Sequence, residues 1–250
     1  MILRQLLHHE RTIAVSYLIG CAGKEVAAIV DPVAAPPTYL DAADQLGVKI
    51  GFVIDTHLHA DHLSTGRALA AQAGAAYVLH ASARPSYPFR AVEEGEALTV
   101  GNVSLDVMHV PGHTPEHIAL RVVDRTRGDQ PWLVLTGHTL MVGDMGRTEL
   151  ASSAEAGARA LFASAQKLRA LQDDVIVLAG AFAGSVCGRG LSANPITTIG
   201  FERRHNRAFR LEEEEEFVAF MLRDTPPRPP GAEETRAANL GGGPPVAVAP

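Results

Sequence analysis

The chain has 250 residues, of which 46% are apolar, and this is enough for one large domain with a sizeable core. Its formal net charge of −6 argues against a nucleic-acid or anionic-membrane partner, because an acidic surface attracts neither. The sequence has no apolar run near the roughly 18 residues that span a bilayer, no signal-peptide pattern and too few cysteines for a disulfide framework, so we expect a cytoplasmic protein.

In the first part of the chain, strand patterns alternate with helix patterns. Strands are predicted at 15–19, 25–30, 49–54 and 76–79, and helices at 37–46 and 66–73. The first two strands form a hairpin that ends at Asp31-Pro32. The strand at 49–54 is almost continuously apolar, which indicates burial on both faces.

The middle of the chain continues the strand series and adds one long helix. A hairpin is predicted over 98–110 around Gly101-Asn102. Further strands are expected at 118–123, 132–135 and 174–178, and the longest helical pattern covers 154–171. Hairpins mixed with strand–helix units predict an α/β fold whose sheets are mixed.

Two features stand out in the C-terminal part of the sequence. The acidic run 212–216 is typical of the solvated start of a helix, with Phe217, Phe220 and Met221 facing the core. From Pro226 onward the composition shifts to Pro, Gly, Ala and Glu, which predicts a mobile tail. We therefore expect a single domain over 1–225 and a tail over 226–250.

The stretch DTHLHADH at 55–62 concentrates metal-binding side chains directly after an apolar strand. His57 and His59 point the same way if the chain there is extended, because side chains alternate with a period of two. If Asp61 and His62 then begin a helix, they present further ligands from the other side. Imidazole and carboxylate are ligands of first-row divalent ions, so this loop predicts a metal site.

Two later loops place a histidine at a strand end in the same way. PGHTPEH at 111–117 offers His113, and TGHTLMVGD at 136–144 offers His138. His109 and His117 lie nearby and are candidates for orienting the ligands. His8, His9, His80 and His205 lack such a context, and we expect ordinary surface or core roles for them.

THLHADH, PGHT and TGHTLMVGDMGR together resemble the metallo-β-lactamase superfamily, and AGSVCGRGLSANPITTIGFERRHNRAF at 183–209 is similar to bacterial persulfide dioxygenases, relatives of glyoxalase II. The resemblance runs from about residue 2 to 225. It implies a four-layer αββα sandwich of two mixed sheets. It also implies a mononuclear iron(II) site at His57, His113 and position 138, and oxidation of glutathione persulfide by O2 to sulfite and glutathione.

The chain departs from this family at two positions. Position 138 is normally aspartate and is histidine here; LAGAF at 178–182 carries Ala181 where a histidine is usual. Dinuclear hydrolases of the superfamily use that aspartate to bridge two metal ions and that histidine to hold the second. Without these two residues, the site lacks the ligands that hold two metal ions for a glyoxalase II-like thioester hydrolysis.

The mononuclear interpretation survives these departures, since a neutral histidine can replace the carboxylate as the third ligand. Three neutral ligands leave the ion one charge unit more positive, which shifts preference from iron toward zinc. If His138 turns away instead, the remaining set is His57, His59 and His113. In the mononuclear site with His138, the residues His59, Asp61 and His62 are either groups that orient the ligands or remnants of a second site. The functions left open are an iron-dependent dioxygenase, a metal-dependent hydrolase and a weakly active relative that only binds.

Other candidates concern the substrate. Arg203 and Arg204 suit the carboxylates of a glutathione-like thiol because guanidinium binds carboxylate through two hydrogen bonds, although an ordinary salt bridge explains them equally well. Cys187 is a candidate for carrying sulfur, yet a lone cysteine is more often a small buried apolar residue. The expected partners are a thiol persulfide and O2, with a homodimer left open.

Overall fold

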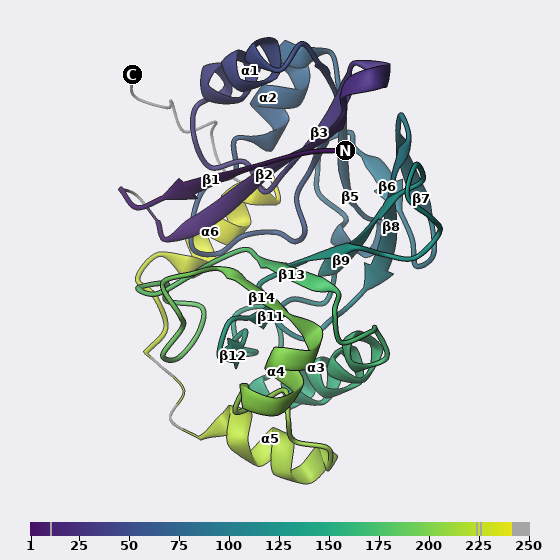
Figure 1. The fold of residues 1–250 in the computed structure, drawn as a ribbon. Helices are drawn as coiled ribbons and strands as arrows, with labels where there is room; N and C mark the ends of the chain where they lie inside the picture. Colours follow the sequence, from purple (N-terminus) through teal and green to yellow (C-terminus); the bar gives the residue numbers. More distant parts are fainter. Residues whose placement is uncertain (11, 224, 226, 242–250) are drawn as a thin grey trace.

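A computed structural model of the chain describes residues 1–10, 12–223, 225 and 227–241. Two six-stranded sheets lie face to face, and Figure 1 shows α1 and α2 at one side of the molecule and α3, α4 and α5 at the other. The first sheet contains, in spatial order, β1 (Ile2–His8), β2 (Ala14–Cys21), β3 (Val26–Val30), β4 (Lys49–Ile54), β5 (Ala76–His80) and β6 (Arg90–Val92). Its first three strands pair antiparallel and the rest pair parallel, so this sheet is mixed.

The second sheet is also mixed. Its strands, in spatial order, are β14 (Ile196–Thr198), β13 (Ile176–Ala179), β10 (Leu133–Gly137), β9 (Ile118–Asp124), β8 (Val103–His109) and β7 (Ala97–Val100). Only β10 and β13 pair parallel. A small hairpin, β11 (Leu140–Met141) and β12 (Asp144–Met145), follows β10 and belongs to neither sheet.

The helices that cover the outer faces of the two sheets are α1 (Pro36–Gln45), α2 (Gly66–Ala73), α3 (Ala154–Arg169), α4 (Ile199–His205) and α5 (Glu214–Leu222). A further helix, α6 (Ala232–Asn239), lies against the loop that follows β4, and short 3-10 turns lie at Ala22–Lys24 and Ala81–Ala83. No helix in the described part of the chain is long and apolar enough to cross a membrane.

Side-chain alternation along the strands divides the interior into three apolar layers. On β9, Leu120 and Val122 point between the sheets, whereas Ala119 points toward α3. On β2, Ile19 points between the sheets and Leu18 packs beneath α1 and α2. Because successive side chains on a strand face opposite ways, both faces of each sheet must be covered. The result is the predicted four-layer αββα sandwich, and the predicted fold class is confirmed.

Most predicted elements are present. β4 and α2 have the predicted bounds, and Phe217 and Met221 of α5 are buried in the core as expected. The segment predicted as a mobile tail differs from expectation, because it contains α6 with hydrogen bonds to the rest of the fold. Residues 242–250 of that segment lie outside the described residues, and the domain boundary at 225 stays a prediction.

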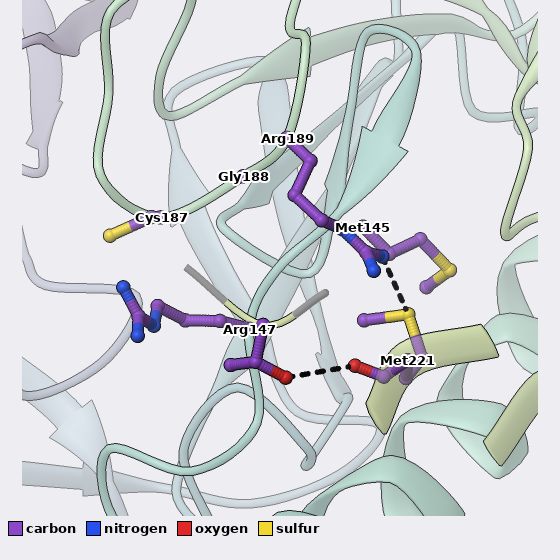
Figure 2. A pocket seen from close by; sticks show the side chains of 7 residues that line it. Met145, Arg147, Cys187, Gly188, Arg189 and Met221 are labelled. Carbon is purple, nitrogen blue, oxygen red and sulfur yellow. Dashed lines mark hydrogen bonds between the residues drawn. The ribbon is translucent and has the colours of Figure 1, made fainter. Parts of the chain in front are cut away.

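The loop between β13 and β14 forms one wall of a small pocket (Figure 2). Arg189 anchors this loop by donating to the Asp144 carboxylate from its backbone N–H (2.8 Å) and from Nε (3.0 Å). The Arg147 guanidinium donates to the Val186 carbonyl oxygen at 3.0 Å. The loop that carries Cys187 is thereby attached to the chain that follows His138.

We predict that Gly157→Ala destabilises the fold by about 1–3 kcal/mol, although alanine is the better helix former by roughly 0.5–1 kcal/mol. A Cβ at this position of α3 would lie 2.3 Å from the Thr148 carbonyl oxygen and 3.0 Å from that of Gly112, and backbone atoms cannot easily move away. Denaturant unfolding measures the change. Gly23→Ala is the control, because a Cβ there has no heavy atom within 4 Å. Equal stability of both variants would contradict the close packing of α3.

Candidate metal centre

Three histidines from three separate segments meet at one edge of the sandwich. His57 follows β4, His113 follows β8, and His138 follows β10. Their ring centroids lie 4.9 Å apart for His57–His113 and His57–His138, and 5.1 Å apart for His113–His138. One nitrogen of each lies within 4.8 Å of the others, and the side chains are 0 to 1% exposed. The structure thus brings the three predicted strand-end histidines together.

Hydrogen bonds determine which nitrogen of His57 and His113 is free to bind a metal. His113 Nδ1 lies 2.7 Å from the Arg147 carbonyl oxygen, and a carbonyl only accepts, so Nδ1 carries the proton. Nε2 therefore keeps its lone pair, and it lies 3.4 Å from His138 Nδ1. The Thr56 hydroxyl donates to Asp31 at 2.9 Å and therefore accepts from His57 Nδ1 at 3.0 Å. His57 Nε2 is buried without a hydrogen-bond partner.

The protonation of these rings suits metal binding. Burial and the neighbouring imidazoles lower the pKa of His57 well below its ordinary value. Burial and His138 lower the pKa of His113 to about 3. Burial also lowers the pKa of His138. The three rings are therefore neutral at physiological pH, which is the form that ligates divalent ions.

His117 lies beside the cluster without offering it a lone pair. Its Nε2 accepts from the His138 backbone N–H at 3.1 Å, and its Nδ1 faces the Thr139 hydroxyl at 3.1 Å. It holds the His138 backbone, in agreement with the orienting role considered for it. His109 lies elsewhere, stacked on His80 with ring centroids 3.9 Å apart.

His59, Asp61 and His62 form a second group of donor atoms next to the first. Asp61 Oδ1 lies 3.7 Å from His59 Nδ1 and 3.2 Å from His62 Nδ1. These three atoms and His62 Nε2 are buried with no hydrogen-bond partner. Asp61 and His62 lie in a loop, because α2 begins only at Gly66, and the proposed helical start is wrong for them.

The unpartnered atoms indicate that the residues fit a bound divalent ion. A buried polar atom without a partner costs about 1–3 kcal/mol, and here such atoms converge from several nitrogens and one carboxylate oxygen. Nitrogen-rich sets with an added carboxylate suit first-row metals such as iron and zinc. Ala181, by contrast, is buried among Met141 and Ala179 and offers no donor at the position where the sequence resemblance implies a histidine.

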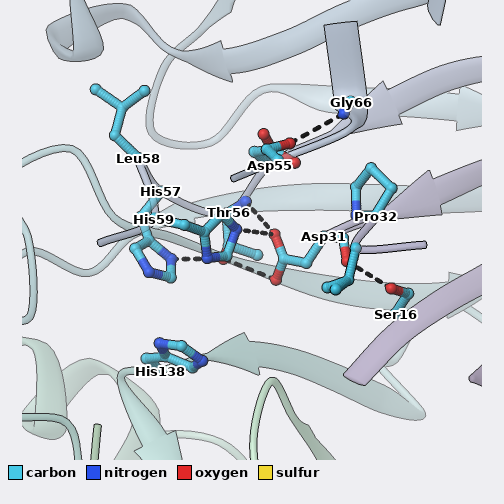
Figure 3. Close-up of polar contacts among 12 residues, drawn as sticks. Ser16, Asp31, Pro32, Asp55, Thr56, His57, Leu58, His59, Gly66 and His138 are labelled. Carbon is cyan, nitrogen blue, oxygen red and sulfur yellow. Dashed lines mark hydrogen bonds and ion pairs between the residues drawn. The ribbon is translucent and has the colours of Figure 1, made fainter. Parts of the chain in front are cut away.

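Asp31 is a site residue that the sequence analysis missed. Its carboxylate accepts from the Thr56 backbone N–H at 2.7 Å and lies 3.3 Å from His59 Nε2, as Figure 3 shows. Burial would raise the pKa of Asp31, but His59 and the Thr56 donors hold it below its ordinary value. Its place directly after β3 is the same strand-end position that revealed the histidines.

Helix α6 ties down the loop that carries His57 to His62. Asn239 Nδ2 donates to the carbonyl oxygens of His59 (2.8 Å) and His62 (2.9 Å), and its Oδ1 accepts from the Ser64 backbone N–H at 3.1 Å. Arg236 donates to the Leu58 carbonyl oxygen at 2.9 Å and pairs with the buried Glu116 at 3.0 and 3.2 Å. Part of the predicted tail therefore supports the candidate metal loop.

The predicted substrate arginines lie on α4 and form other contacts. Arg203 pairs with Asp173 at 2.6 Å and donates to the carbonyl oxygens of Arg169 and Leu171, and Arg204 lies 3.9 Å from Asp173. None of the contacts described for either arginine reaches a histidine of the cluster. The salt-bridge alternative thus accounts for their described geometry.

Comparison with known proteins agrees with this geometry. Residues 10–180 match the metallo-beta-lactamase superfamily. A hydroxyacylglutathione hydrolase from Rhodospirillum rubrum is 31% identical over 166 residues, which are 66% of this chain and 60% of that protein. This chain thus spans about 60% of the length of the curated hydrolases that it matches.

Solved structures match over almost the whole chain. A metallo-beta-lactamase from Staphylococcus aureus has a TM-score of 0.91 and 31% identity, over 97% of this chain and 73% of that one. ETHE1 from Myxococcus xanthus has a TM-score of 0.83 and 29% identity, over 97% of this chain and 100% of that one.

We expect His57→Ala and His113→Ala each to abolish stoichiometric metal binding without unfolding the protein, because these strand-end side chains lie outside the apolar layers. Metal per chain is measured by mass spectrometry after loading and gel filtration, and circular dichroism reports the fold. His205→Ala, at an exposed residue of α4, is the matched control and should bind metal like the parent. Full metal content in both ligand variants would refute the ligand assignment.

Asn239→Ala should weaken metal binding by roughly 10-fold or more, the usual effect of removing groups that orient metal ligands. The change leaves the carbonyls of His59 and His62 without their donor, so the loop loses its fixed shape. Competition with a chromogenic chelator gives the affinity. Glu234→Ala, an exposed change on the same helix, is the control. An affinity within twofold of the parent would show that α6 does not support the site.

Proposed function

Because the chain belongs to the metallo-beta-lactamase superfamily, we propose that it is a mononuclear metal-dependent dioxygenase, which oxidises a glutathione-type persulfide with O2 to sulfite and thiol. The observation that carries the proposal is the set His57, His113 and His138, whose neutral nitrogens meet at one buried point. Three protein ligands leave positions open for small molecules. The match to ETHE1 from Myxococcus xanthus, over 97% of this chain and 100% of that one, supports this function.

The three histidines would hold iron(II), with zinc as the alternative. Bound there, iron(II) would supply the redox chemistry that the reaction of a persulfide with O2 requires. The overall reaction consumes one persulfide, one O2 and one water, and it yields one thiol, one sulfite and two protons. O2 oxidises the terminal sulfur, the bond between the two sulfurs breaks, and the inner sulfur gains a proton to become the thiol.

The protein residues act mainly by holding the ligands in place. The Arg147 carbonyl keeps the proton of His113 on Nδ1, and the Asp31–Thr56 pair does the same for His57. His117 fixes the backbone of His138. Burial of all three imidazoles keeps bulk water from competing for the open positions.

Thioester hydrolysis is the alternative function, supported by the 31% identity to the hydroxyacylglutathione hydrolase. Two residues weigh against it. His138 provides no carboxylate to bridge two ions, and Ala181 provides no ligand at all. A hydroxide held between two ions is what such hydrolysis uses, so we rank this function second and a weakly active, binding-only protein third.

Several expectations stay predictions within this proposal. Arg203 and Arg204 would bind the carboxylates of a glutathione-like thiol only if their ion pairs with Asp173 were broken. A cytoplasmic location and a homodimer are consistent with the proposed reaction and await direct measurement.

The test compares two substrates on the same preparation. With iron-loaded protein, glutathione persulfide should cause O2 uptake and sulfite formation in equal amounts, whereas lactoylglutathione should be hydrolysed at least about 100-fold more slowly, because the two-metal clamp is missing. An oxygen electrode, a sulfite assay and thioester absorbance give the rates. Efficient thioester cleavage without O2 uptake would reverse the ranking, and inertness toward both substrates would favour the binding-only protein.

His138→Asp provides the matched variant for this test. It would rebuild a set of two histidines and one carboxylate, which is the ligand set of many non-haem iron oxygenases. Persulfide-dependent O2 uptake should be retained or raised, and thioester cleavage should stay low because Ala181 is unchanged. A gain in thioester cleavage alone would favour the hydrolase.

A further inference from the structure

The C-terminal segment 227–241, which contains α6, runs along the loop that carries His57 to His62. In Figure 1 the yellow helix α6 lies between the group of α1 and α2 and the group of α3, α4 and α5. The segment begins beside the chain that follows β12, where the Arg228 guanidinium donates to the Glu149 carbonyl oxygen at 2.8 Å. It ends beside the chain that precedes β6, where the Ser86 backbone N–H donates to the Leu240 carbonyl oxygen at 3.0 Å.

The first residue of α6 lies at a seam between two parts of the chain that surround the histidine cluster. Ala232 is buried in a small apolar group with Ala60 and Leu150. Ala60 belongs to the loop after β4 that carries His57, and Leu150 follows Arg147, whose carbonyl oxygen lies beside the cluster. The helix therefore joins two sides of the candidate metal centre.

We propose that the segment 227–241 is a lid, and that metal ions enter and leave the histidine cluster only after α6 has moved away from the loop that follows β4. With α6 in place, His57, His113 and His138 are each 0 to 1% exposed. The pocket of Figure 2 is lined by none of these three residues. The proposal concerns access alone, so it holds whichever reaction the protein catalyses.

The way in which α6 is attached allows it to open without unfolding the sandwich. Of the residues of α6 only Ala232 is buried, and Leu240, directly after the helix, is partly buried against the layer beneath α1 and α2. Segments with few buried apolar contacts open at a lower free energy than the core does. A helix as short as α6 is marginal in water by itself, so it should lose its helical structure as it leaves.

The ion pair between Arg236 and Glu116 is the main latch of the lid. The guanidinium donates to Glu116 Oε1 at 3.0 Å and to Oε2 at 3.2 Å, and the two side chains are 17% and 2% exposed. Glu116 Oε1 also accepts from the Leu58 backbone N–H at 3.0 Å, and Arg236 donates to the Leu58 carbonyl oxygen at 2.9 Å. This pair therefore connects α6 with the loops after β4 and β8. Bidentate pairs between arginine and carboxylate are among the stronger hydrogen bonds in proteins.

A lid differs kinetically from a helix that only supports the ligands. If metal ions pass only through the open state, the rates of metal entry and metal removal are both proportional to the open fraction, and a weaker latch raises both. If α6 only supports the ligands, a weaker latch speeds removal and leaves the rate of entry unchanged. The rate of entry is thus the quantity that decides between the two.

The experiment mixes metal-free protein with Co²⁺ in a stopped-flow spectrometer, follows visible absorbance, and then removes the ion with EDTA. Arg236→Ala should raise both rates by roughly 10-fold or more, because it removes the charged latch. Glu116→Gln should raise both rates as well, while its amide oxygen can still accept from the Leu58 N–H. Arg207→Ala, at an exposed arginine of another segment, is the matched control. Faster removal with an unchanged rate of entry would overturn the proposal.

A further variant leaves every hydrogen bond of the latch in place. Ala237 is an exposed residue of α6, and glycine there lowers the stability of the helix alone. Ala237→Gly should therefore raise the rate of Co²⁺ entry by roughly 2- to 5-fold, in line with the usual difference between glycine and alanine in a helix. A rate of entry equal to that of the parent would contradict a lid that unfolds as it opens.

Hydrogen exchange in the metal-free parent tests the lid without any variant. Peptides from α6 should exchange their amide hydrogens much faster than peptides from α3, which is packed into the core. Equal protection of α6 and α3 would mean that α6 opens only when the whole protein unfolds, and would refute the proposal. Because none of these readouts depends on turnover, failure of the dioxygenase assay and failure of this proposal are separate results.

Discussion

Burial of the imidazole nitrogens is the constraint on which the rest of the site depends. In water each nitrogen would find a partner, but at the edge of this sandwich only protein groups or an ion can serve. The Arg147 carbonyl and the Asp31–Thr56 pair occupy one nitrogen each of His113 and His57, so the remaining lone pairs must face inward. The αββα scaffold makes this convergence possible, because β4, β8 and β10 all end at the same edge.

The same constraint explains why a polar helix belongs to the site. The loop from His57 to His62 has no secondary structure, so its carbonyl oxygens need donors from outside. Asn239 and Arg236 supply them from α6, and Arg236 also neutralises the buried Glu116. Only Ala232 of this helix is buried, so polar contacts rather than an apolar face attach it.

The contrast between apolar and polar contacts determines which elements could be predicted from the sequence. Periodicity located β4 and α2 to the residue, and histidines after apolar strands predicted the cluster, since both signals are local. Helix α6 has no apolar stripe, and its partners lie about 180 residues away in the chain, so composition suggested a tail instead. β1 was missed because much of it is exposed and its burial does not alternate strictly. Asp31 was missed although it follows a strand in the same way as the histidines do.

The charges around the cluster explain how a site with a neutral histidine at position 138 can accommodate a cation. Burial alone would lower the pKa of His59, but its contacts with Asp31 and Asp61 raise it well above its ordinary value. Asp31 and Asp61 therefore place negative charge beside the neutral imidazoles of His57, His113 and His138. A cation on His57, His113 and His138 would be balanced by carboxylates next to it rather than by one that binds it. Asp31 and Asp61, rather than a residue at position 138, thus supply the negative charge beside the three histidines.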